Sequence, residues 1–190
     1  MIRDDLSDRL IHLTRGSSED PKKNREESVG NLISILDSGA LKGGNGFIKG
    51  GYICACFSEA PVSKLPYIIA NSVVHKFKYS PYGVMVEKRW FYQQGGRPVV
   101  YGPPEDFDLL PEEMKHRYVQ LHLGKPYDID FTWEREWRLR SDSLVLDPAT
   151  TTVILPDRIA RDVFSDRFGA KWHYLVLSDL GVRISALLDD

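Results

Sequence analysis

The sequence predicts an α+β fold with a mixed or mostly antiparallel sheet. Segments of strand and helix character follow one another without the regular alternation of a parallel α/β protein. The 190 residues fit a single domain, 1–190, and we find no internal repeat and no low-complexity segment. Together these observations favour one core in which several helices flank a sheet of irregular connectivity.

The composition indicates a globular protein, at 42% hydrophobic, 27% charged and 11% aromatic residues. The net charge of −2 argues against general electrostatic binding of nucleic acid but does not exclude a local basic patch. No apolar run approaches the length of a membrane span, and the first residues lack the apolar core of a signal peptide. We therefore expect a cytoplasmic protein with no membrane partner. The two cysteines, Cys54 and Cys56, are expected to be reduced and buried.

The N-terminal third predicts a strand, a loop and a helix. Residues 9–14 form the strand, with His12 and Thr14 on one face. The polar stretch 15–27 is expected to be an exposed loop. A helix follows because apolar residues recur at helical spacing, and Gly39 suits a left-handed C-terminal cap. Its apolar stripe consists of Val29, Leu32, Ile33 and Leu36.

A glycine-rich stretch then leads into the middle of the chain. Residues 39–51 hold six glycines in neither the P-loop nor the dinucleotide-binding pattern, which indicates a mobile loop or, alternatively, a flap over a pocket. The wholly apolar run 52–57 predicts a central strand. The elements expected next are a short helix from Ser63 to about 70 or 74, strands at 82–86 and 98–101, and a helix at 109–123.

In the C-terminal third we expect one or two strands within 131–146, a strand at 151–155, a helix at 156–168, a strand at 174–177 and a weaker strand at 182–188. The stretch 131–140 concentrates charge between aromatic residues. If it were a single strand, Glu134 and Glu136 would share one face with Arg138 and Arg140. Such a face is either an ordinary solvated surface with ion pairs or one wall of a polar cleft.

The residues alone bear on three kinds of site. Basic and aromatic residues interleave between 75 and 92, as in platforms that stack single-stranded nucleic acid, although core aromatics flanked by solvated lysines give the same pattern. The candidates there are Lys76, Lys78, Tyr79, Lys88 and Arg89. The histidines have no metal-ligand spacing, so no metal site is predicted. A metal-dependent nuclease stays an alternative, although Glu134-Arg135-Glu136 lacks the lysine of such sites.

The order of three motifs resembles the ADP-ribosyltransferase superfamily, whose members bind NAD in a cleft of a split sheet. The motifs are His12-x-Thr14 on the first strand, Ser58-Glu59-Ala60-Pro61 after a central strand, and Glu134-x-Glu136 on a later strand. The N-terminal segment, with His12-x-Thr14 followed by residues 31–41, is similar to the opening of DarT-like toxins, which modify DNA bases. The wider layout, given in order by residues 56–61, 82–84, 97–101 and 133–138, resembles bacterial abortive-infection proteins of the AbiG type.

The resemblance implies roles for individual residues. His12 would hydrogen-bond the ribose of NAD, and Thr14 and Arg15 would hold its nicotinamide side or its diphosphate. Tyr52 or Phe57 would stack on the nicotinamide, and Ser58 would join this NAD-binding set. Glu136 would bond the 2′-hydroxyl and stabilise the oxocarbenium-like state as nicotinamide leaves. Glu134 would orient or deprotonate the acceptor.

The resemblance therefore implies an NAD-dependent ADP-ribosyltransferase that acts as a bacterial toxin or phage-defence effector. Its acceptor would be a nucleic acid or a protein, and an antitoxin or defence-system partner would accompany it. The alternatives are a non-catalytic module of the same fold that binds nucleic acid or protein, and the metal-dependent nuclease.

Overall fold

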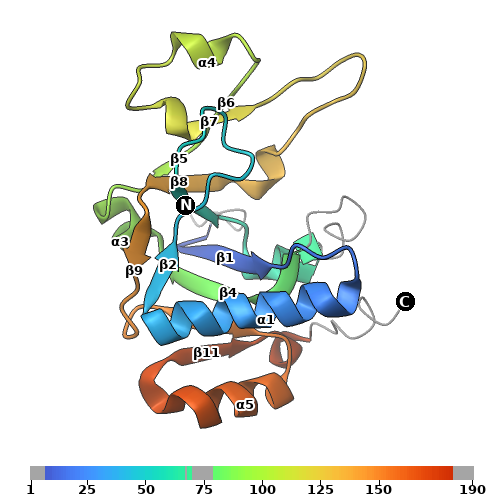
Figure 1. Ribbon diagram of the computed structural model, residues 1–190, viewed down its shortest axis with the longest axis vertical. Helices are drawn as coiled ribbons and strands as arrows, with labels where there is room; N and C mark the ends of the chain where they lie inside the picture. The colour runs from blue at the N-terminus through green and yellow to red at the C-terminus, as the bar shows by residue number, and fades with distance from the viewer. Residues whose placement is uncertain (1–6, 67, 70–78, 182–190) are drawn as a thin grey trace, which may run out of the picture. The chain divides into compact units, whose positions relative to one another are not determined.

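The computed structural model describes residues 7–66, 68–69 and 79–181 (Figure 1). It confirms the α+β class, because it contains a seven-stranded mixed, mostly antiparallel sheet and few helices. The chain groups into two compact units, each built from discontiguous segments. The first comprises residues up to Leu10, Leu41–Ala60 and Glu87–Leu144, and the second comprises Ile11–Ala40, Pro61–Val86 and the residues from Val145 onward.

The strands of the second unit follow the order β11-β10-β4-β1. These are β1 (Arg9–Arg15), β4 (Tyr79–Glu87), β10 (Thr152–Leu155) and β11 (His173–Val176). β10 pairs with β11 in parallel and with β4 antiparallel, so the sheet is mixed. Gly83 allows β4 to lie close to β1, because a Cβ there would come within 2.2 Å of the carbonyl oxygen of His12. The strand predictions at 9–14, 82–86, 151–155 and 174–177 are confirmed.

The first long helix, α1 (Pro21–Ser38), begins well before its apolar stripe, so the predicted loop at 15–27 is wrong from Pro21 onward. Asp20 caps it by accepting a hydrogen bond from the Lys23 N–H at 2.9 Å, and proline occupies the first turn. Its buried side chains include two small polar ones, Asn24 and Ser28. Gly39 ends the helix with φ 64°, as predicted.

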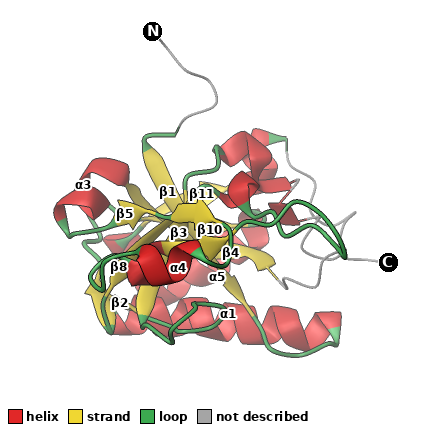
Figure 2. Cartoon of the chain, turned by 90° about the horizontal axis from the view of Figure 1, so that it is seen from above, coloured by secondary structure: helices red, strands yellow, loops and turns green. Residues whose placement is uncertain are grey.

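The second long helix, α5 (Arg158–Phe168), packs on β10 and β11 (Figure 2). Asp157 caps it by accepting from the Ala160 N–H at 2.8 Å. The Phe164 ring is buried and lies 6.5 Å from the ring of Tyr82. The expected helix at 156–168 is thus confirmed apart from its first two residues. Short 3₁₀ turns follow at Gly169–Lys171 and Leu177–Leu180.

In the first unit, β3 (Cys54–Ser58), β8 (Glu136–Arg140) and β5 (Arg97–Pro98) form antiparallel pairs. Two small sheets accompany them, β2 (Ala40–Lys42) with β9 (Ser143–Val145), and β6 (Val100–Gly102) with β7 (Tyr118–Gln120). A helix, α3 (Lys88–Gln93), supplies the buried ring of Phe91, which lies 4.8 Å from the ring of Phe57.

The predicted helix at 109–123 is wrong. The short helix α4 (Asp106–Leu109) ends at the first residue of this segment, which instead contains a 3₁₀ turn at Lys115–Arg117 and then β7. Leu110 is extended, with ψ 139°, because the following Pro111 disfavours helical backbone at the residue before it. Tyr118 is buried, and its hydroxyl donates to the carbonyl oxygens of Gly102 and Pro103.

Two other predicted elements differ in extent. The helix expected from Ser63 begins as a 3₁₀ turn, Val62–Lys64, and its predicted end at 70 or 74 lies outside the described residues. The weak strand at 182–188 also lies outside them. Within the described ranges, no helix is long and apolar enough to cross a lipid bilayer.

Candidate functional site

A polar face of the first unit carries the candidate catalytic residue Glu136. In the antiparallel register of β3 and β8, Ser58 lies opposite Glu136, Cys56 opposite Arg138 and Cys54 opposite Arg140. Residues directly opposite each other in an antiparallel pair project from the same face of the sheet. The three short side chains of β3 therefore share a face with one carboxylate and two guanidinium groups of β8.

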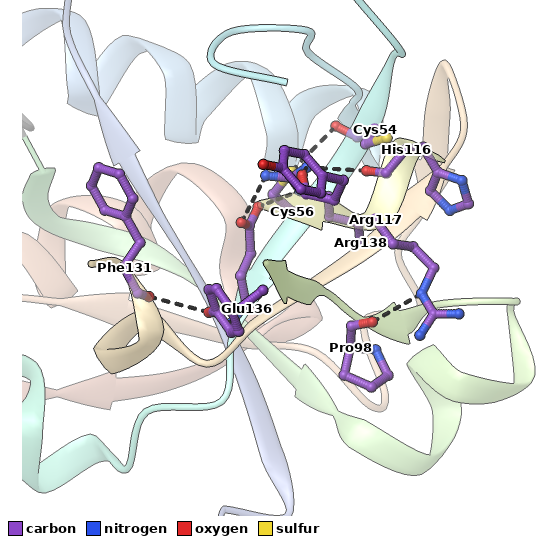
Figure 3. Close-up of polar contacts among 10 residues, drawn as sticks. Cys54, Cys56, Pro98, His116, Arg117, Phe131, Glu136 and Arg138 are labelled. Atoms are coloured by element: carbon purple, nitrogen blue, oxygen red, sulfur yellow. Dashed lines mark hydrogen bonds and ion pairs between the residues drawn. The ribbon is translucent and has the colours of Figure 1, made fainter. Parts of the chain in front are cut away.

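On this face, Glu136 and Arg138 form a two-pronged ion pair (Figure 3). The Arg138 Nε and Nη2 each donate to a different carboxylate oxygen of Glu136, both at 2.9 Å. The side chain of Arg138 is 5% exposed and that of Glu136 is 14% exposed. A fork-to-fork pair of this kind fixes the plane of the carboxylate as well as its position.

Arg138 also ties β8 to the segment that follows α4. Its Nη1 donates to the carbonyl oxygens of His116, at 3.0 Å, and Tyr118, at 2.9 Å. Burial by itself lowers the pKa of the Arg138 guanidinium, but its hydrogen bonds to Glu136 and the charge of that carboxylate raise the pKa above its ordinary value. The buried guanidinium is therefore held as a cation at the centre of a network of four hydrogen bonds.

Tyr101 fixes the start of β8. Its hydroxyl donates to the Phe131 carbonyl oxygen at 3.1 Å and accepts from the Glu136 N–H at 3.3 Å. Burial raises the pKa of Tyr101 to about 12. The phenol thus stays protonated in the folded protein at pH values where an exposed tyrosine ionises.

Replacing Tyr101 by phenylalanine is expected to remove part of the alkaline pH dependence of stability. Because the folded-state pKa lies above the unfolded value, the contribution of Tyr101 is fully present below pH ~10. It is lost as pH rises through about 12. Urea denaturation at pH 8 and pH 11 checks this, and the variant should lose less stability than the parent between the two. Equal losses in both proteins would contradict the assignment.

The two candidate glutamates do not share a strand face, so that prediction is wrong. Glu134 ends a 3₁₀ turn, Thr132–Glu134, and Arg135 adopts a left-handed conformation with φ 47° before β8 begins at Glu136. The predicted alternation holds only from Glu136 onward. Ser58 fixes this turn, because its hydroxyl donates to the Glu134 carbonyl oxygen at 2.5 Å.

The expected stacking residues and the cysteines also lie in the first unit. Phe57 is 2% exposed and packs on Phe91, whereas Tyr52 is half-buried, with the Arg140 guanidinium 4.9 Å from its ring centre and its hydroxyl bonded to Glu112. Tyr52 is therefore the better candidate for stacking on a ligand. Both cysteines are free thiols.

Burial, followed by the charge of Glu136, raises the pKa of Cys56 well above its ordinary value. Burial likewise raises the pKa of Cys54. Both groups are therefore protonated thiols near neutral pH, which makes them poor nucleophiles.

Sequence reasoning gave no role to Glu59, which the structure places in a second buried cluster. One Glu59 oxygen accepts from the Lys88 Nζ at 2.9 Å and the other from the Trp137 Nε1 at 2.9 Å. Lys88 is thus engaged in a largely buried ion pair, while Arg89 of the same helix is exposed. Of the other predicted nucleic-acid contacts, Tyr79 begins β4, and Lys76 and Lys78 lie outside the described residues.

The remaining NAD-binding candidates belong to β1 of the second unit. Thr14 is 3% exposed and its hydroxyl donates to the Tyr82 carbonyl oxygen at 3.0 Å, so it joins β1 to β4. His12 is half-buried, and Arg15 is exposed at the end of the strand. His12 and Glu136 belong to different units, and the implied binding of one NAD molecule by both residues stays a prediction.

Comparison with known proteins yields no match to this chain among family models, curated proteins or solved structures. Within the described residues, no group of three or more His, Cys, Asp or Glu side chains is placed to hold a metal ion. We therefore infer the function from the chemistry of the residues themselves.

Proposed function

We propose that this chain is an NAD-dependent ADP-ribosyltransferase-like effector, with Glu136 as its catalytic residue. The observation that carries the proposal is the state of that carboxylate. It stands at the first residue of β8, it is oriented by a buried guanidinium, and it is still 14% exposed. A carboxylate fixed in this way is preorganised for charge that develops beside it.

The reaction breaks the bond between the nicotinamide nitrogen and the ribose carbon of NAD, and nicotinamide leaves with the electron pair. The ribose then carries positive charge, which the Glu136 carboxylate stabilises while it accepts a hydrogen bond from the 2′-hydroxyl. The acceptor forms the new bond to the same carbon and gives up its proton to a base, a role proposed for Glu134.

The ion pair with Arg138 is compatible with this role. Each carboxylate oxygen has two acceptor positions, and each oxygen of Glu136 takes one hydrogen bond from Arg138. A ribose hydroxyl can therefore bond the carboxylate without displacing the guanidinium. The resemblance also assigns NAD-binding roles to His12, Thr14, Arg15, Tyr52 and Ser58.

The proposed acceptor is a nucleic acid or a protein, and the proposed setting is a bacterial toxin or phage-defence system with an antitoxin or defence partner. One observation favours a second candidate, a binding module of the same fold without turnover. Both Glu136 oxygens and three nitrogens of Arg138 are occupied within the protein, as in an ion pair that serves the fold alone.

Incubation with NAD separates the two candidates. We expect the purified chain to bind NAD in a calorimetric titration and to release nicotinamide when single-stranded DNA, RNA or a protein extract is added. When the NAD is isotopically labelled in its adenine, the label should be transferred to one of those acceptors. The binding module would instead be supported if the chain binds nucleic acid, shows no heat of binding on titration with NAD and releases no nicotinamide. Cleavage of nucleic acid that requires a divalent cation and is unaffected by NAD would support the nuclease.

A further inference from the structure

The turn between β1 and α1, residues 15–18, borders a surface hollow in the second unit. The hollow has a volume of about 480 Å³, which lies within the range of small-molecule sites. Its lining comprises Arg15, Gly16, Ser17, Glu27, Gly30 and Asn31. None of these side chains belongs to the Glu136 cluster, although Arg15 is also one of the residues proposed to bind NAD.

Donors from this turn converge on one carboxylate oxygen of α1. The Oε2 of Glu27 accepts from the Ser17 N–H at 2.5 Å, from the Ser17 hydroxyl at 2.9 Å and from the Ser18 N–H at 3.3 Å. Successive backbone N–H groups that point at one position form a concave anion-binding site. Here the anion in that position is supplied by the protein's own helix.

The turn is held in this shape from both ends. The Asn31 amide donates to the Arg15 carbonyl oxygen at 2.9 Å, and the Asn24 amide donates to the Ser18 carbonyl oxygen at 3.3 Å. Gly16 is required between them, because a Cβ there would lie 2.5 Å from the Asn24 carbonyl oxygen and 2.9 Å from Glu27 Oε2. The N–H and hydroxyl donors of the turn are therefore already oriented toward one position without a ligand.

We propose that this turn is a binding site for a phosphoryl group and that Glu27 is its built-in competitor. A phosphate oxygen accepts the same N–H and hydroxyl hydrogen bonds as a carboxylate oxygen, and it carries more charge. Arg15 lines the same hollow and supplies the neighbouring cation. Glu27 is exposed on the surface of α1, so a rotamer change moves its carboxylate out of the site without unfolding the helix.

The phosphoryl group can come from inorganic phosphate or from the diphosphate of a nucleotide. The hollow is larger than one phosphate needs, which favours the diphosphate. The inference does not require turnover of NAD, because it concerns only how the turn binds an anion. The effect of Glu27 is inhibitory, since a ligand must displace a carboxylate that already satisfies the donors.

The test compares phosphate, pyrophosphate and ADP in calorimetric titrations at constant ionic strength. Glu27→Ala is expected to bind pyrophosphate at least about tenfold more tightly than the parent, which corresponds to about 1.4 kcal/mol. Glu26→Ala is the matched control, because it removes an exposed carboxylate from the same turn of α1; it should leave the affinity near that of the parent. Adding Ser17→Ala to Glu27→Ala should weaken binding again, because one donor is lost.

Equal pyrophosphate affinities in the parent and in Glu27→Ala would overturn the proposal, as would an equal gain in Glu26→Ala. If Glu27→Ala does not fold, as judged by circular dichroism, Glu27→Gln decides, since it keeps the side-chain length and removes the charge. ADP binding as tight as pyrophosphate supports a diphosphate site, and phosphate binding as tight as pyrophosphate supports a single-phosphate site. Failure of nicotinamide release in the parent would leave these affinities unaffected.

Discussion

Replacing Arg138 by methionine is expected to lower the free energy of unfolding by about 3–5 kcal/mol, the usual cost of leaving one member of a buried ion pair without its partner. The Glu136 carboxylate would lose both of its guanidinium hydrogen bonds. The carbonyl oxygens of His116 and Tyr118 would lose the donor that joins them to β8. Methionine fills much of the arginine volume, so the loss would reflect the missing charge and donors more than a cavity.

Urea denaturation of two further variants separates these contributions. Combining Glu136→Met with Arg138→Met should recover most of the stability, because no charge is then left buried alone. Arg138→Lys keeps the charge but not the planar fork, so its stability should lie between those of the parent and Arg138→Met. A loss below about 1 kcal/mol in Arg138→Met would mean that the pair behaves as an ordinary surface ion pair.

The strands of the second unit were predictable because their apolar residues are continuous or alternate over several positions. The runs around Val84, Ile154 and Leu175 have few polar residues within them, and the turn-forming pair Pro156-Asp157 follows the second. The cap at Gly39 was predictable for a similar local reason, since glycine directly after an apolar helical stripe adopts a positive φ at low cost. In these places local preference and tertiary packing favour the same structure.

Prediction failed where tertiary contacts decide the structure. The first half of α1 buries Asn24 and Ser28, and their side chains bond the backbone of nearby residues, which a search for apolar periodicity does not detect. Residues around Tyr118 have helical spacing, yet they form a short strand that pairs with β6. That pairing connects segments 18 residues apart, Val100 with Tyr118, and no local pattern specifies it.

The residues of the candidate site could be predicted from the sequence, but the partner that each side chain contacts could not. The spacing of Glu136, Arg138 and Arg140 placed them on one face, and β8 bears this out. The partner of each side chain depends on the register of β3 against β8, which determines that Cys56 faces Arg138 and Ser58 faces Glu136. Glu59 was visible in the sequence only as part of a motif, because its partners lie 29 and 78 residues away.

Replacing Glu136 by glutamine is expected to lower the rate of nicotinamide release by about 10²–10³-fold, the usual effect of removing one preorganised electrostatic contact from a transition state. Glutamine keeps the side-chain length and one acceptor oxygen, so the 2′-hydroxyl can still bond it. It lacks the negative charge that the developing oxocarbenium ion requires. If NAD binds as proposed, the loss should appear mainly in kcat, with a smaller change in KM, because NAD in its ground state would make the same hydrogen bond to the glutamine.

Glutamine also weakens the pair with Arg138, so the decisive comparison is with a variant that loses stability without touching this carboxylate. Trp137→Phe removes the hydrogen bond to Glu59 at the adjacent position of β8 and should cost about 1–3 kcal/mol while its nicotinamide release stays near that of the parent. Glu105→Gln, at an exposed position of the same unit, controls for the loss of one charge. If Glu136→Gln releases nicotinamide as fast as these two variants, Glu136 serves the fold alone, because a carboxylate that stabilises the transition state cannot be neutralised without slowing bond cleavage.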